Sequence, residues 1–108
     1  MTDEEVRNKA RELRLQHAYP VGPEREGPWC RAIDLTPEKL ARVYLNLRDK
    51  IFRRRARFGG PVWDHMGRLS EFAIWRYGEE QMRGEILAEE LRREEARHRP
   101  KHAPEQLG

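Results

Sequence analysis

The chain has 108 residues, enough for one domain, with an apolar share of 37% against a usual value of roughly 45–50% and a charged share of 38% against about 25%. The single cysteine excludes an internal disulfide, and no apolar run approaches the roughly 18 residues that a membrane-spanning helix needs. The sequence opens with acidic residues and no apolar h-region, so a secretory signal is not expected and a cytoplasmic location is favoured.

The first predicted helix begins at Thr2. Thr2 and Glu5 form the S/T-x-x-E pattern, in which each side chain bonds the free backbone N–H of the other residue. Apolar residues then continue at helical spacing up to Leu13, and a stretch rich in Pro and Gly stops the helix. Residues 18–35 are expected to form an irregular but ordered arm, with a short strand at residues 30–33.

A second helix is predicted from a clear pair of end signals. Thr36 is an N-cap residue followed by Pro37, whose φ suits the first helical position, and the Gly pair at 59–60 closes the far end. Its apolar arc is broad, so this helix is expected to lie at the centre of the fold.

Two further helices follow in the predicted order. One opens at Pro61 with an apolar stripe on one face, and residues 79–98 form a highly charged helix with little amphipathic character. Residues 99–108 have the composition of a disordered tail. The sequence therefore predicts one compact all-α domain of three to four helices over residues 1–98.

Positive charge is concentrated on the second helix. Residues 37–60 hold eight Lys or Arg and only two Asp or Glu, while the segments before and after them are slightly acidic. Six polar residues step along this helix by three and four, cover about 80° of its circumference and span about 27 Å. No acidic residue interrupts the row. These residues are Lys39, Arg42, Asn46, Lys50, Arg53 and Arg57.

Such a row predicts contact with a polyanion. Cations on one rigid face repel each other, and a phosphate backbone relieves this repulsion because each neutralised phosphate releases condensed counterions. Two alternatives stay open for the same row, which can dock on an acidic protein surface or remain a solvated helix face. In the second alternative the arginines near the helix C-terminus only complement its dipole.

The third predicted helix carries a second candidate site. His65, Arg68, Phe72 and Trp75 form a row away from the apolar stripe, and exposed rings beside arginine are typical of partner hot spots and base-stacking platforms. The alternative is that the 18–35 arm, through Tyr19 and Trp29, covers this row. Trp63 is predicted to be a core anchor.

No motif in the sequence predicts catalysis or a bound group. The four histidines and Cys30 lack the spacing of a metal site, so neither a metal nor a cofactor is expected. The Gly-Gly-Pro stretch has no following Lys-Ser or Lys-Thr, which a phosphate-binding loop would need. The chain is therefore expected not to be an enzyme.

The leading hypothesis is a small non-enzymatic accessory protein of phage, plasmid or defence-system origin that binds the phosphate backbone of DNA or RNA without reading sequence. The alternative is an adaptor or inhibitor that docks on an acidic surface of a larger, nucleic-acid-processing complex, with the basic helix and exposed aromatic rings in the contact. A third hypothesis is a homodimer in which the charged helices at 79–98 pair.

Overall fold

A computed structural model describes residues 1–15, 18–22, 27–53 and 57–98. Helices dominate this part of the chain, joined by one small two-stranded sheet, and the expected all-α class is confirmed. The elements in chain order are α1 (Asp3–Glu12), β1 (Ala18–Pro20), β2 (Trp29–Arg31), the 3₁₀ helix η2 (Ala32–Asp34), α2 (Pro37–Phe52), α3 (Pro61–Tyr77) and α4 (Glu79–His98). The predicted disordered tail at 99–108 lies outside the described residues.

Both predicted N-caps are confirmed. The Thr2 hydroxyl accepts a hydrogen bond from the backbone N–H of Glu5 at 3.1 Å, and α1 begins at the next residue. The Thr36 hydroxyl accepts from the backbone N–H of Lys39 at 3.3 Å, with Pro37 as the first residue of α2. In each case the hydroxyl satisfies one of the N–H groups that a helix start leaves without a partner.

The far end of α2 differs from the prediction. The helix ends at Phe52 rather than at Gly59–Gly60, so Arg57 and Phe58 are not on its surface. Arginines crowd the chain directly after Phe52, and the one carboxylate in the last turns of α2, Asp49, lies 3.3 Å from Arg93 of α4. Like charges one turn apart destabilise a helix. The carboxylate of Asp49 could offset this repulsion, but it also pairs with Arg93 of α4, so α2 ends early.

The arm between α1 and α2 contains a short antiparallel hairpin. Tyr19 pairs with Cys30 at its centre, so a strand does form near the predicted position, but it ends at Arg31 and continues as η2. Side chains from the end of α3 hold the segment that follows. The Arg76 guanidinium donates to the Ile33 carbonyl at 2.8 Å, and the Tyr77 hydroxyl donates to the Leu35 carbonyl at 2.9 Å.

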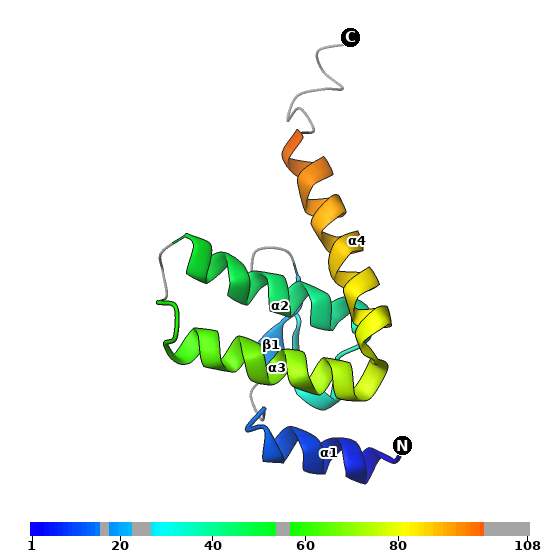
Figure 1. Cartoon of the computed structure of the whole chain (residues 1–108). Helices are drawn as coiled ribbons and strands as arrows, with labels where there is room; N and C mark the ends of the chain where they lie inside the picture. Colours follow the sequence, from blue (N-terminus) through cyan, green and yellow to red (C-terminus); the bar gives the residue numbers. More distant parts are fainter. Residues whose placement is uncertain (16–17, 23–26, 54–56, 99–108) are drawn as a thin grey trace.

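The helices enclose a single apolar core. α2 and α3 lie side by side, α1 lies along the other side of α3, and the hairpin lies behind α2 and α3 (Figure 1). The innermost side chains come from α1's end, the arm, α2 and α3, and they are essentially inaccessible to solvent: Leu15, Leu35, Leu40, Leu69 and Phe72. The predicted central position of α2 is confirmed by its packing against both α3 and α4.

One residue, Gly78, separates α3 from α4. Its φ of 94° and ψ of 148° belong to a region of backbone space that is essentially restricted to glycine, and this conformation turns the chain sharply into α4. The first half of α4 packs on α2 and α3 through Met82, while the second half projects from the body (Figure 1). Among the described residues, no helix combines the length and apolar character that crossing a bilayer requires.

Candidate functional site

The predicted basic row on α2 is interrupted by carboxylates from two elements. The Arg42 guanidinium donates to Glu38 at 2.8 Å, and its Nε lies 3.6 Å from a carboxylate oxygen of Glu89 on α4. Arg42 is therefore neutralised within the chain. The expectation that no negative charge interrupts this row is wrong because α4 brings a carboxylate to it from 47 positions further along the sequence.

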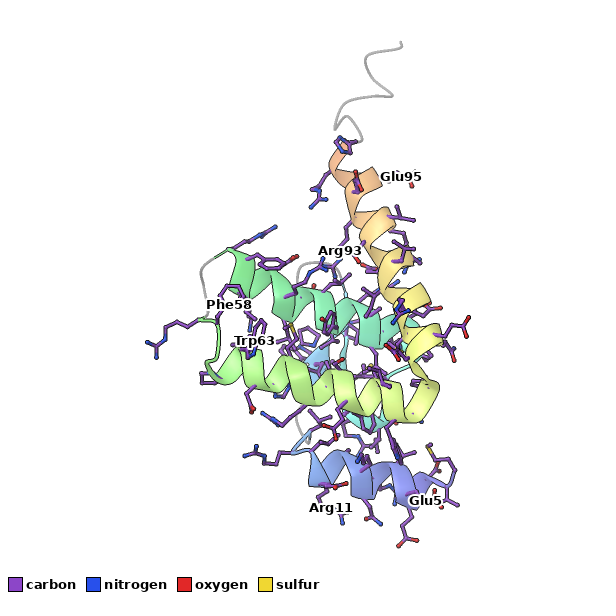
Figure 2. The ribbon with its side chains drawn as sticks, viewed as in Figure 1. Glu5, Arg11, Phe58, Trp63, Arg93 and Glu95 are labelled. Carbon is purple, nitrogen blue, oxygen red and sulfur yellow. The ribbon has the colours of Figure 1, made fainter. Side chains whose placement is uncertain are left out.

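Asn46, at the middle of the row, is buried. Its side chain is 7% exposed, and its Oδ1 accepts a hydrogen bond from Arg93 of α4 at 2.8 Å. The expectation that Asn46 contacts an external partner is wrong, because α4 covers it. Figure 2 shows Arg93 reaching from α4 toward α2 at this position. The covered residues divide the predicted row into Lys39 at one end and Lys50, Arg53 and Arg57 toward the other.

A buried carboxylate on α4 organises this contact. Glu89 is 6% exposed, and it accepts hydrogen bonds at 2.9 Å from both Arg92 and Arg93. Desolvation on burial favours the protonated form, but the hydrogen bonds and positive charges of Arg93 and Arg92 outweigh it, and the pKa of Glu89 is lowered. Arg93 also donates to the backbone carbonyl of Arg42 at 3.2 Å. The middle of α2 is thus engaged in contacts with α4 and not with solvent.

The remaining cations gather where α2 leads to α3. Arg53 caps the end of α2 and Arg57 lies in the connection to α3, and both side chains are exposed. Within the described part of the chain, no carboxylate lies within ion-pair distance of either guanidinium. Lys50, one turn before Arg53, is half-buried at the wall of a cleft. Of the predicted row, Arg53 and Arg57 are therefore the fully exposed cations, while Lys39, at the other end of the row, is half-buried.

Exposed aromatic rings accompany these two arginines. Phe52 ends α2, Phe58 follows Arg57, and both are exposed. Trp63, on the first turn of α3, is 42% exposed and packs against Phe58 with ring centroids 5.2 Å apart (Figure 2). The prediction of Trp63 as a core anchor is wrong. The buried residues of α3, from Met66 to Ala73, all come after Trp63 in the helix.

We call this group the basic aromatic end, and it comprises Phe52, Arg53, Arg57, Phe58 and Trp63. A cleft of about 560 Å³ opens next to it, between the hairpin, α2 and α3. The described residues that line it are mainly apolar, with Lys50 as their one Lys or Arg, and they are Ala18, Tyr19, Pro20, Trp29, Val43, Leu47, Lys50, Pro61, Val62 and His65. Trp29, at the edge of the hairpin, is largely exposed.

Tyr19 and His65 supply polar atoms at this cleft. The Tyr19 hydroxyl and the His65 Nε2 form a hydrogen bond, and their rings are tilted against each other with centroids 5.4 Å apart. Burial raises the pKa of Tyr19 to about 12, although the nearby charge of Arg68 lowers it in part. The Tyr19 hydroxyl is therefore protonated at all physiological pH values.

The second predicted site, on α3, is not a surface patch. Phe72 is completely buried, so its predicted exposure is wrong. Arg68 donates to the Leu13 carbonyl at 2.8 Å and to Asp64 at 2.9 Å, which ties α3 to the end of α1. The alternative that the arm covers this row holds for His65, which contacts Tyr19.

Trp75 is the member of that row that keeps some solvent contact. It is 36% exposed, and its ring stacks on Phe72 at a centroid distance of 6.1 Å. The Lys9 ammonium of α1 lies over the same ring, 5.8 Å from its centroid. The four residues are not brought together as an open platform, because α1 occupies the side of α3 on which they lie.

Among the described residues, no three His, Cys, Asp or Glu side chains are grouped in a way that could hold a metal ion. No protein-family model, curated protein or solved structure matches the chain. Hypotheses about function therefore rest on the chemistry of the basic aromatic end and the cleft beside it.

Proposed function

We propose that this chain is a small non-enzymatic accessory protein that binds single-stranded nucleic acid at its basic aromatic end. The observation that carries the proposal is the presence of Arg53 and Arg57 among three exposed aromatic rings. Among the described residues, neither guanidinium has a carboxylate partner. Phosphates can pair with the arginines, and unstacked bases can stack on the aromatic rings.

The arginines account for backbone affinity. Each phosphate neutralised on a single strand contributes about −0.7 to the slope of log affinity against log salt concentration. With Arg53, Arg57 and the neighbouring Lys50 in contact, a slope between about −1.4 and −2.1 is expected. This footprint is shorter than the row of six residues that the sequence predicts, since Arg42 and Asn46 are engaged with α4.

The rings favour a single strand over a duplex. Bases in a duplex are already stacked on each other, whereas the bases of a single strand present free faces, and each base–aromatic contact contributes roughly 1–3 kcal/mol. Trp63 and Phe58 already pack against each other, so little side-chain freedom is lost when a base stacks on the exposed Trp63 face.

The adjacent cleft can take a base that leaves the stack. Its apolar walls and the exposed Trp29 ring suit a planar aromatic group, and the Tyr19 hydroxyl, which keeps hydrogen-bonding capacity beyond its bond to His65, offers a hydrogen bond to its edge. Lys50 at the cleft wall lies on the side of α2 that leads to Arg53. A strand that contacts Arg53 and Arg57 thus passes close to the opening.

Docking on an acidic protein surface is the second candidate, favoured by the same exposed rings, which are typical of interface hot spots. Fluorescence anisotropy with mixed-sequence DNA and RNA oligonucleotides, at several salt concentrations, separates the two. Nucleic-acid binding predicts the salt slope above, whereas the adaptor predicts no retention of either polymer even at low salt.

Variants then locate the site. Arg53→Ala with Arg57→Ala is expected to weaken binding roughly 10- to 50-fold and to reduce the salt slope by about 1.4. Trp63→Ala is expected to weaken binding about tenfold with an unchanged slope. The matched control is Arg11→Ala, an exposed arginine on α1 at a distance from this end (Figure 2). An equal loss in the control contradicts the proposed location.

A further inference from the structure

We propose that a cavity of about 340 Å³ between α1 and the segment formed by β2 and η2 binds a small phosphate monoester with a compact apolar group. Three arginines line this cavity, Arg7, Arg11 and Arg31, and we call it the three-arginine cavity. Its volume lies at the lower end of the roughly 300–1,000 Å³ that is usual for small-molecule sites. The described residues that line it do not belong to α2 or α3, so the site is separate from the basic aromatic end and does not depend on nucleic-acid binding.

The three arginines come from two elements that pack together. Arg7 and Arg11 lie one turn apart on α1, so they share a face of the helix, and Arg31 is the last residue of β2. All three side chains are exposed, and η2, which directly follows Arg31, packs against α1. The described lining contains no aspartate or glutamate. Like charges one turn apart destabilise a helix, and a bound anion would relieve this repulsion.

Few of the guanidinium donors are used within the chain. Arg11 donates to the side chain of Asn8 at 3.3 Å, and the Arg31 Nε donates to Asp34 at 3.3 Å. In the described part of the chain, no carboxylate lies within ion-pair distance of Arg7 or Arg11, and the two terminal nitrogens of Arg31 have no hydrogen-bond partner. Because each guanidinium has five N–H donors, most donors at the cavity are available to a ligand.

Local helix electrostatics account for one of these arginines and not for the other two. Arg11 lies in the last turn of α1, where the helix dipole favours a cation, whereas Arg7 lies in the middle of the helix and Arg31 on another element. Asp3 precedes Arg7 by one turn, but their charged groups lie beyond ion-pair distance. The grouping of the three cations at one cavity therefore calls for an anion from outside the chain.

The charges at the cavity match a dianion. Three positive charges, less the one negative charge of Asp34 that is bonded to Arg31, leave two. A phosphate monoester carries about −1.5 to −2 at pH 7 and offers three acceptor oxygens, which arginine can bind two at a time. A phosphodiester within a nucleic-acid strand carries a single charge, so the cavity favours the monoester. Arg11→Ala thus remains a suitable control for strand binding.

The rest of the lining is apolar and small. Ala10, Leu15 and Ala32 are buried, and the half-buried Ile33 adds its side chain to the cavity wall. The methylene stems of the arginines extend this apolar surface. These groups cannot bond a phosphate, but they can cover a short alkyl group attached to it. The ligand is therefore a small organic phosphate and not inorganic phosphate alone.

Isothermal titration calorimetry of the full chain with butyl phosphate, at low salt and neutral pH, tests the proposal. This monoester is aliphatic, so it cannot stack on the rings of the basic aromatic end. It is expected to bind more tightly than inorganic phosphate and than butanol, since each of these lacks one half of the ligand, and its affinity is expected to fall as the salt concentration rises. Absence of binding at millimolar butyl phosphate, or equal binding of butanol, overturns the proposal.

Variants locate the ligand. Arg7→Ala with Arg31→Ala is expected to weaken butyl phosphate binding about tenfold with an unchanged circular dichroism spectrum, because both side chains are exposed. Ile33→Ala is expected to weaken butyl phosphate about threefold and to leave inorganic phosphate unaffected. The matched control is Arg83→Ala, an exposed arginine on α4. A loss in this control equal to that of the double variant overturns the assigned location.

A phosphate monoester can come from a free small molecule or from a phosphorylated side chain of a protein. A short peptide with one phosphoserine between alanines separates these sources. Because the apolar part of the cavity is small, the peptide is expected to bind no more tightly than butyl phosphate. A peptide that binds more tightly than butyl phosphate would assign the site to a phosphorylated protein and overturn the small-molecule proposal.

Discussion

Glu89 holds two helices together at one point. Its carboxylate bonds Arg92 and Arg93, and Arg93 in turn bonds Asn46 and the carbonyl of Arg42 on α2. A buried charge whose partners are removed is costly, so this cluster is stable only while all its members are present. Glu89 therefore fixes Arg93, which makes three of the polar contacts between α4 and α2, to Asp49, Asn46 and the Arg42 carbonyl.

Replacement of this carboxylate, Glu89→Gln, is expected to lower the free energy of unfolding by about 2 kcal/mol at neutral pH. The pKa of Glu89 is lowered in the folded chain, so the unfolded chain binds the proton more readily. The stabilisation from Glu89 is complete above its ordinary pKa of 4.5 and is lost as the pH falls through the folded-state pKa. Urea denaturation at neutral pH and at about pH 3 measures both effects.

Glu90→Gln is the matched control for this change. Glu90 is the next residue and pairs with Arg48 at 3.5 Å, but it lies near the surface, where a single ion pair contributes roughly 0–1 kcal/mol. Similar losses in the two variants would contradict the role assigned to Glu89. If the free energy of unfolding depends on pH in the same way in the wild-type and Glu89→Gln chains, the lowered pKa of Glu89 would be contradicted.

Tyr19 gives a prediction at alkaline pH. Its pKa is raised from 10.0 to about 12, so the folded chain holds this proton more tightly, and the resulting stability is present below pH 10 and lost as the pH rises through 12. Titration of tyrosinate absorbance in the native protein is expected to show a late step that Tyr19→Phe abolishes. This variant also loses the bond to His65 and about 1 kcal/mol of stability. A late step that persists in Tyr19→Phe would assign it elsewhere.

Single residues were the hardest to place from the sequence. The helical spacing of Lys39, Arg42 and Asn46 correctly puts them on one face, yet it contains no information about which distant element packs there. Glu89 belongs to a charged helix without a strong apolar stripe, and nothing in its local pattern marks it as buried. The available signal for this contact was the excess of cations on α2 in a chain that also has a carboxylate-rich helix, α4. Opposite charges pair when two such helices meet.

At the scale of elements, the starts of helices were predictable and one end was not. An N-cap is set by two residues three positions apart, so Thr2 and Thr36 mark the starts of α1 and α2 without any tertiary contact. The end of α2 depends on whether Asp49 can offset the arginines near its last turns. Because Arg93 from α4 pairs with Asp49, this end is set by a tertiary contact. β1 was missed because three residues are too few for an alternating pattern.

Gly78 allows a test of the turn between α3 and α4. Gly78→Ala is expected to lower the free energy of unfolding by about 1–3 kcal/mol, because alanine rarely adopts a φ of 94°. A Cβ at this position meets no atom within 4 Å, so the cost lies in the backbone and not in a clash. Gly84→Ala, inside α4 with similarly open space, is the control and is expected to stabilise by about 0.5–1 kcal/mol. Equal effects in urea denaturation would contradict this account.

At the scale of the whole molecule, the all-α class followed from helix caps and helical periodicity, which are local properties. The assignment of aromatic residues to the inside or the outside did not follow from them. Phe72 was assigned to an exposed row, with a covered row as the alternative, and Trp63 to the core, whereas Phe72 is buried and Trp63 is 42% exposed. Phe72 shares its apolar cluster with residues of α1, and no pattern within α3 alone contains that contact.

Alanine substitutions of these two rings are expected to differ sharply. Phe72→Ala is expected to cost about 3–5 kcal/mol, a large part of the roughly 5–15 kcal/mol that keeps a small domain folded. Trp63→Ala is expected to cost about 1 kcal/mol or less, since its ring is 42% exposed. Thermal and urea unfolding of both variants measures the difference, and a larger loss for Trp63→Ala would contradict the placement of both rings.

The position of α4 over the middle of α2 covers one of the cations of the predicted row, Arg42, and the uncharged Asn46. Arg42 lies beneath it, occupied by Glu89, and Asn46 is sealed in beside Arg93. A binding event that draws α4 aside would free Arg42 from Glu89 and leave it with Glu38 on the same helix, one turn away, as its carboxylate partner. In the proposed complex the contact with phosphates would then extend along α2 toward Lys39, so the docking of α4 would limit the length of that contact.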